Sequence, residues 1–329
     1  MAAGSVEPVK WDVACLGDLV MDLVPHSQSG GEWLYVPSPG GAPGNVAVGL
    51  ARLGKRPVML AKVGADGFGQ LISGALDKYG VDTSGLSVTD AGKTRLSVVT
   101  LDAQGDRSFT FYKDNPADAL LSVDDINPSI ISGARLLHIG SLLMASPIAS
   151  KAQDRAIDLA RSLGTPVSVD PNFRPSLWTS HDEMVAAGHS LIARSHIVKL
   201  SEEELRFLAG PGETGEAVRS LWHEQLKVLA VTMGARGAEL FTGRLRIACH
   251  GFSVAAIDTL AAGDAFMASL LSGLLDIGFD TGNETALEHI LRRACAAGAL
   301  ATMTNGAMAS LPHAARITRL LDTVSENAP

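Results

Sequence analysis

The sequence predicts an α/β fold in which helices cover both faces of a mostly parallel β-sheet, a three-layer α/β/α sandwich. Short apolar runs that suit buried strands alternate with amphipathic stretches that suit helices. Several of the apolar runs end in Gly or Asp, at the edge where such sheets bind ligands. No internal repeat or linker interrupts the 329 residues, so a single domain spanning residues 1–329 is expected.

Six apolar runs are predicted to be strands of this sheet. They cover residues 11–17, 57–64, 134–140, 166–171, 196–201 and 226–234. Four amphipathic stretches between them are predicted to be helices, each closing near a glycine that can end a helix. They cover residues 44–54, 67–80, 151–164 and 201–210.

Two β-rich segments, residues 31–38 and 94–113, have no helix between their strands. The second contains two alternating runs around a polar turn from Ala103 to Asp106, which is typical of a hairpin. We expect the two segments to form a small sheet outside the main layers, a lid. Because an exposed lid edge can pair with a second copy, a homodimer is expected.

Composition and charge exclude several classes of protein. The formal net charge of -8, without a basic stripe, argues against nucleic acid as a partner. The three cysteines are far apart and lack metal-ligand spacing, so neither a disulfide framework nor a zinc site is indicated. No signal-peptide pattern and no run of roughly 18 apolar residues is present. These observations predict a cytoplasmic protein without a membrane partner.

The strongest chemical signal lies between residues 255 and 278. A short strand leads into a tight turn of small residues, Ala261, Ala262 and Gly263, and an apolar helix follows. The turn therefore lies at a helix N-terminus, where backbone N–H groups attract an anion. Asp264, in the first helical turn, is placed to accept a proton from a hydroxyl group in the same space. On this segment alone, an acid that only stabilises the helix dipole is the commoner explanation.

Polar residues in the N-terminal part could contact the hydroxyl groups of a ligand. Asp18 and Asp22 follow the first strand, and their carboxylates can accept hydrogen bonds from hydroxyls. The paired glycines Gly40 and Gly41 let a backbone pass close to a polyol, and Asn45 can both donate and accept. Loop acids facing water explain the two aspartates equally well. On the residues alone, a Gly-Pro turn before a helix is the commoner explanation of Gly40, Gly41 and Asn45.

A second polar group follows the strand predicted at 166–171. Asp170, Asn172 and Arg174 alternate, so their side chains can share one side of an extended segment. The fork of Arg174 could meet a phosphate or a polar sugar edge. A surface ion pair is the ordinary alternative.

Together these motifs resemble the PfkB, or ribokinase, family of carbohydrate kinases over nearly the whole chain. DTLAAGDAF, from Asp258 to Phe266, is similar to the family signature DTxGAGD, and residues 38–54 are similar to its GGxxxN element. The resemblance implies a ribokinase-like fold and an ATP-dependent kinase, with Asp264 as catalytic base and an anion hole formed by the backbone of residues 261–263. Ala in place of Gly at the hole should cost little unless the backbone needs a positive φ.

The resemblance and the lid prediction extend the site to further residues. Sugar-binding residues are expected at Asp18, Asp22, Gly40, Gly41, Asn45, Asn172 and Arg174, with Ser97, Phe109 and Phe111 of the lid closing over the sugar. Residues near the magnesium complex of ATP are expected at Ser201, Glu204, Thr232, Gly234 and Gly237. An activating K⁺ is expected between two segments, mainly on carbonyl oxygens, at Asp258, Leu260, Ala301, Thr304, Gly306 and Ser310. Ser201 departs from the Asn of the family's NxxE motif, and a charged helix start explains Glu204 just as well.

Within the family the chain looks most like fructokinases. The stretches that support this are GDLVMDLVP, FTFYKDNPADALL, DPNFRPSLW and VKLSEEEL. The implied reaction transfers the γ-phosphoryl group of ATP to a primary hydroxyl of fructose. Ribose, an aminoimidazole riboside and 2-keto-3-deoxygluconate remain alternative substrates, and a sugar- or nucleotide-binding regulator without turnover remains an alternative class. A dinucleotide-dependent oxidoreductase is disfavoured because the chain lacks GxGxxG followed by an acid about 20 residues later.

Overall fold

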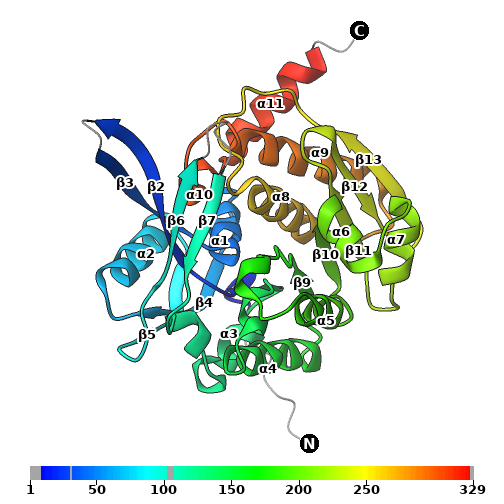
Figure 1. The fold of residues 1–329 in the computed structure, drawn as a ribbon. Coiled ribbons are helices and arrows are strands. Elements are labelled where there is room, and N and C mark those ends of the chain that lie inside the picture. The colour runs from blue at the N-terminus through cyan, green and yellow to red at the C-terminus, as the bar shows by residue number, and fades with distance from the viewer. Residues whose placement is uncertain (1–8, 30–31, 102–106, 327–329) are drawn as a thin grey trace, which may run out of the picture.

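The computed structural model describes residues 9–29, 32–101 and 107–326, which form a large sheet, a small sheet and the helices around them (Figure 1). The large sheet has nine strands, in the spatial order β13 (Arg246–His250), β12 (Gly237–Phe241), β11 (Val228–Thr232), β10 (Ile197–Ser201), β9 (Val167–Val169), β8 (Leu137–Ile139), β1 (Val13–Leu16), β4 (Pro57–Gly64) and β5 (Asp82–Thr89). Neighbouring strands are parallel except that β12 runs antiparallel to both β11 and β13. All six predicted strands are present.

Helices pack on both faces of the large sheet, and side chains alternate between the two cores. In β1, Val13 and Cys15 join one core, while Ala14 and Leu16 join the other. The first core is covered by α1 (Ala42–Arg52), α2 (Gly67–Lys78), α8 (Ala262–Asp276), α9 (Glu284–Ala301), α10 (Ala307–Ser310) and α11 (Ala314–Glu326). The second is covered by α3 (Pro128–Ser132), α4 (Ala149–Ser162), α5 (His181–Ile192), α6 (Glu202–Ala209) and α7 (Thr214–Leu221). The predicted three-layer sandwich is confirmed.

The small sheet has four strands in the order β3 (Glu32–Gly40), β2 (Val20–Ser29), β6 (Arg95–Leu101) and β7 (Arg107–Tyr112). Its presence confirms the expected lid sheet, and the β2–β3 hairpin reaches away from the main body (Figure 1). Strand β2 was not predicted, so Asp22 lies within a lid strand rather than in a loop after β1. Gly31 and the predicted turn from Ala103 to Asp106 lie outside the described residues.

The parallel strands of the large sheet bring several predicted site residues to one edge of the sheet. The carboxyl ends of β1, β8, β9, β10 and β11 open at the same edge of the sheet, as parallel pairing requires. Among the described residues, no helix is both long and apolar enough to cross a bilayer.

Candidate active site

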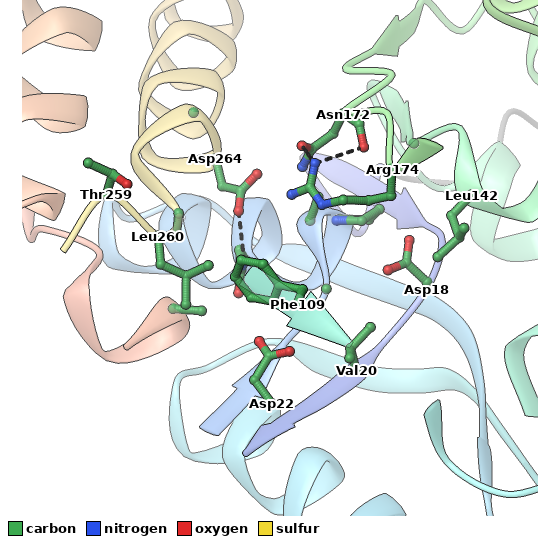
Figure 2. A pocket seen from close by; sticks show the side chains of 18 of the residues that line it. Asp18, Val20, Asp22, Phe109, Leu142, Asn172, Arg174, Thr259, Leu260 and Asp264 are labelled. Atoms are coloured by element: carbon green, nitrogen blue, oxygen red, sulfur yellow. Dashed lines mark hydrogen bonds between the residues drawn. The ribbon is translucent and has the colours of Figure 1, made fainter. Parts of the chain in front are cut away.

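A cavity of about 810 Å³ lies at this edge, between the strand ends, the start of α8 and the lid (Figure 2). It is lined by many of the predicted site residues, which come from distant parts of the chain. These are Asp18, Asp22, Gly41, Asn45, Phe109, Phe111, Asn172, Arg174, Asp258, Leu260, Ala261, Gly263 and Asp264. The fold therefore gathers the expected sugar and phosphoryl residues in one space.

Asp264 lies in the first turn of α8 and faces the cavity (Figure 2). Its side chain is buried, and its Oδ2 accepts a hydrogen bond of 2.7 Å from Nδ2 of Asn45. Burial raises the pKa of Asp264 above its usual value, although Asn45, Lys199 and Arg174 each oppose the rise. A carboxylate whose proton affinity is raised in this way suits a general base.

The turn before α8 contains one strained residue. Ala261 has φ 59° and ψ 11°, the left-handed conformation that favours glycine. Alanine was expected to cost little at this turn unless the backbone needed a positive φ. Because the φ of Ala261 is positive, alanine in place of glycine is strained here.

Asp258 connects this turn to the segment after α9. Its Oδ1 accepts from the N–H of Leu260 and its Oδ2 from the N–H of Gly306, both at 2.9 Å. The N–H groups of Ile257 and Asp258 in turn donate to the carbonyl of Thr302. The two segments expected to hold K⁺ are therefore adjacent. Of the other residues expected there, Ala301, Thr304 and Ser310 do not line the cavity.

Asp18 and Asp22 line the side of the cavity opposite Asp264 (Figure 2). Burial raises the pKa of Asp18 to about 6, with a further contribution from Asp118. Ser97 is fully buried and donates its hydroxyl hydrogen to Oδ1 of Asp22. Gly40 lies against the same carboxyl, since a Cβ on it would be 2.8 Å from Oδ2 of Asp22. Ser97 and Gly40 therefore support Asp22 and do not line the cavity themselves.

Arg174 and Asn172 form the wall above Asp18. Nη1 of Arg174 donates to Oδ1 of Asn172 at 2.6 Å, and Asn172 has a positive φ of 45°. Both residues line the cavity. Arg174 is exposed, as the surface alternative expected, but its guanidinium bonds to Asn172 at the cavity and not to a carboxylate partner.

The residues expected near the nucleotide lie at the ends of strands β10 and β11 or after them and are not among the residues that line the cavity. Ser201 and Glu204 form a capping box at the start of α6: Oγ of Ser201 accepts from the N–H of Glu204 at 3.1 Å, and Oε2 of Glu204 accepts from the N–H of Ser201 at 2.7 Å. Thr232 ends the neighbouring strand β11, and Gly234 follows it. Gly237 is buried, because a Cβ there would be 2.0 Å from the carbonyl oxygen of Cys249.

Sequence reasoning missed Lys199. This residue lies in β10, lines the cavity, and places its Nζ 2.9 Å from Oδ2 of Asp170. The signal that could have found it is a charged residue inside an otherwise apolar strand, since lysine is rarely fully buried without a partner.

Residues 10–314 match the family described as pfkB family carbohydrate kinase. The chain belongs to this family. It is 36% identical to probable fructokinase-4 of Arabidopsis thaliana over 326 residues, covering 98% of this chain and 99% of that protein. The resemblance inferred from the sequence motifs and the expected class of enzyme, an ATP-dependent carbohydrate kinase, are confirmed.

Solved structures of family members show the same fold as this pfkB kinase. The structure of a fructokinase from Xylella fastidiosa with bound ATP has a TM-score of 0.87 at 29% identity, covering 95% of this chain and 99% of that chain. A fructokinase from Vibrio cholerae in a fructose, ADP and calcium ion bound form has a TM-score of 0.85 at 36% identity, covering 94% and 99%. The expected ribokinase-like fold class is confirmed by these two likenesses.

Proposed function

We propose that this protein is a fructokinase that transfers the γ-phosphoryl group of ATP to a primary hydroxyl of fructose. The observation that supports this most directly is Asp264, buried at the N-terminus of α8 and facing a cavity large enough for a sugar and phosphates. The similarity to fructokinases, one of them in a form with bound fructose and ADP, favours fructose as the acceptor.

The sugar lies between the two acidic walls of the cavity. Asp18, Asp22 and Asn45 accept or donate hydrogen bonds to its hydroxyls, while Arg174 and Asn172 contact its polar edge. Asp264 accepts the proton of the attacking hydroxyl, whose oxygen then bonds to the γ-phosphorus as the bond to ADP breaks. General-base catalysis of this kind contributes on the order of 10²- to 10⁴-fold.

The backbone N–H groups of residues 261–263 are the proposed anion hole. They lie at the start of α8, where the helix dipole favours negative charge. Small side chains let the phosphoryl group approach these groups closely, and the fixed donors need no reorganisation during the reaction.

Magnesium enters as the complex with ATP, where it neutralises charge on the phosphates. Both carboxylate oxygens of Glu204 accept backbone N–H groups, Oε1 from Phe173 and Oε2 from Ser201. Each oxygen keeps a second lone pair, so Glu204 can still accept a hydrogen bond from the water shell of the ion.

Activation by K⁺ rests on the segments joined by Asp258. Carbonyl oxygens of the two segments, with the carboxylate beside them, are donors that suit a monovalent cation. We expect activity to rise when Na⁺ is replaced by K⁺ at constant ionic strength.

A panel of acceptors tests the proposal. With ATP and Mg²⁺, kcat/KM is measured for fructose, ribose, an aminoimidazole riboside and 2-keto-3-deoxygluconate by ADP release. Fructose is expected to give the highest value by at least tenfold. A higher value for another acceptor refutes fructose as the substrate, and no phosphorylation of any sugar refutes the kinase assignment.

The lid also bears on assembly. Residues Trp33, Leu34, Tyr35 and Val36 of edge strand β3 are exposed, an apolar stretch that suits pairing between two copies. We therefore propose a homodimer in which lid sheets meet, and a cytoplasmic location that matches the free cysteines among the described residues. Sedimentation velocity of the wild type and of a Leu34→Lys variant tests the dimer, because the lysine should produce monomers.

A further inference from the structure

Strand β10 carries a buried cation that the proposed reaction does not yet use. Lys199 is 5% exposed in a strand whose other residues are mostly apolar. Alternation along the strand puts its side chain on the same face as Ile197, which belongs to the core under α8. The long side chain therefore runs beneath the start of that helix.

The ammonium group ends against the proposed anion hole. Nζ of Lys199 is 2.9 Å from Oδ2 of Asp170, and a Cβ built on Gly263 would be 3.1 Å from the same Nζ. Lys199 lines the cavity together with Gly263 and Asp264. A phosphoryl group held on the N–H of Gly263 would consequently meet this ammonium.

Stability alone does not explain the pair. Removing two charges from water costs several kcal/mol per ion, and well-packed apolar residues of similar volume are often as stable or more so. Oδ1 of Asp170 is buried without a hydrogen-bond partner, so the pair is incompletely satisfied. Burial also raises the pKa of Asp170 to about 7 against the opposing effect of Lys199.

The charges around Lys199 leave it as the local cation for a phosphate. Burial lowers the pKa of Lys199, but the carboxyls of Asp170, Glu204 and Asp264 outweigh burial, so the pKa is raised. His138 on β8 stays neutral, since burial and Lys199 lower its pKa to about 3. Arg174 lies across the cavity from Asp264, bonded to Asn172, and acts on Asp264 only through its charge (Figure 2). Without the lysine, an incoming phosphoryl group would meet Asp264 in the cavity, with the charges of Asp170 and Glu204 nearby and no ammonium group to offset them.

We propose that Lys199 is a further catalytic residue, whose ammonium hydrogen-bonds the transferring phosphoryl group beside the backbone N–H groups of α8. Asp170 is its positioning residue. This inference rests on the proposed kinase reaction. The proton of the sugar hydroxyl still goes to Asp264, the new bond forms between that oxygen and the γ-phosphorus, and ADP leaves. Lys199 keeps its protons throughout and supplies charge stabilisation at the transition state.

Three variants test the proposal. Lys199→Met should lower kcat by about a hundredfold to a thousandfold, as loss of a single anion-hole donor does, with the KM values for fructose and ATP within about threefold of wild type. Asp170→Asn keeps the ammonium and should lose less. The double variant Asp170→Asn with Lys199→Met removes both members of the pair, so Asp170 is not left as a buried carboxyl without its counter-ion, and this variant is usable even if Lys199→Met alone fails to fold.

The double variant separates the two explanations. If Lys199 is catalytic, the kcat of the double variant stays as low as that of Lys199→Met. If the lysine only neutralises Asp170, the kcat of the double variant returns to within about threefold of the wild-type value, and this result would overturn the proposal. A rise in KM without a fall in kcat would overturn it as well. Wild-type protein inactive on every sugar of the panel would instead refute the proposed function itself.

A binding measurement gives a second readout. Calorimetry of ADP, Mg²⁺ and fructose with and without aluminium fluoride, an analogue of the transferring phosphoryl group, is compared between wild type and the double variant. Loss of the fluoride-dependent gain in affinity, with ADP affinity retained, supports the assignment. An unchanged gain contradicts it.

Discussion

The two walls of the cavity are built differently. On the side of the large sheet, β10 is buried along its length and most of α8 is buried as well. On the lid side, the first six residues of β3 are exposed. Groups that must keep a fixed geometry, such as Asp264, lie on the buried wall, whereas the lid is the more exposed element, which suits a part of the fold expected to close over a substrate. Substitutions on the two walls should therefore have different kinetic signatures.

The largest effect is expected on the buried wall. Asp264→Asn should lower kcat about a thousandfold while ATP and fructose still bind, because only the base is lost. The matched control is Asp276→Asn, at the other end of α8 and largely exposed. Turnover is followed by ADP release and binding by calorimetry, and a near-normal turnover of Asp264→Asn would disprove the base.

Gly41 tests the rigidity of the same wall. It has φ 103°, and a Cβ there would be 2.4 Å from the carbonyl oxygen of Asp18. Gly41→Ala should destabilise the fold by about 2–5 kcal/mol, because strain and overpacking add. Gly54→Ala, at φ 82° with open space around it, should cost only about 1–2 kcal/mol. Urea unfolding compares them, and equal losses would contradict the packing argument.

Asp18 connects sugar binding to pH. Its folded pKa of about 6 lies above the usual value of an aspartate, so the folded state binds the proton more tightly. The stability from that proton is complete below about pH 4 and is lost as pH rises through 6. Asp18→Asn should therefore be more stable than wild type at pH 7 by roughly 1–3 kcal/mol, and by less at pH 4.

Protonation of Asp18 at low pH favours stability but should weaken the binding of fructose. The wild-type KM for fructose should rise as pH falls below 6, since the protonated carboxyl accepts fewer hydrogen bonds. Asp18→Asn should have a raised KM that is flat over this range. Thermal melts and initial rates from pH 4 to 8 check both expectations, and a wild-type KM independent of pH would exclude Asp18 as a sugar ligand.

The lid should show a smaller, binding-type effect. Phe109 and Phe111 of β7 line the cavity with their rings 6.2 Å apart. Replacing both with Ala should raise the KM for fructose about tenfold, leave kcat within about threefold, and increase ATP hydrolysis relative to sugar phosphorylation. Thr110→Ala, exposed between them on the same strand, is the control. A loss confined to kcat would mean that the lid takes part in chemistry.

The smallest effect concerns the strained turn. Ala261→Gly should stabilise the fold by up to about 1 kcal/mol, because glycine adopts the left-handed conformation without the Cβ penalty. Ala262→Gly, at the first helical residue, should instead destabilise by a similar amount. Thermal melts of both variants are expected to shift in opposite directions.

Much of the fold was predictable because its signals are local. The apolar strands of the large sheet and a helix end such as Gly54 follow from residue patterns a few positions long. Strand β2 was missed because it begins soon after β1 and contains Pro25, which argues against a strand. The antiparallel pair β12 and β13 was missed because its partners are chosen by tertiary packing.

Site residues that belong to a sequence motif could be predicted. Residues whose role depends on tertiary contacts could not. Asp264 and Asn45 were found from motifs, and the hydrogen bond between their side chains joins positions 219 residues apart. Whether Ser97 faces a ligand or a neighbouring carboxyl depends on lid packing, which no local pattern records. Lys199 lies in the fructokinase-like stretch VKLSEEEL, but no motif gave it a role, and the proposed role rests on its burial beside Gly263.

The helix that begins at the reactive turn has no side-chain cap, since Ala261 at that position cannot offer one. The geometry at the start of the helix depends instead on Asp258, whose carboxylate accepts a hydrogen bond from the N–H of Gly306, 48 residues further along the chain. Substitutions near Gly306, or cations that bind the carboxylate oxygens of Asp258, are therefore expected to change the conformation of the turn before α8 without contacting either substrate.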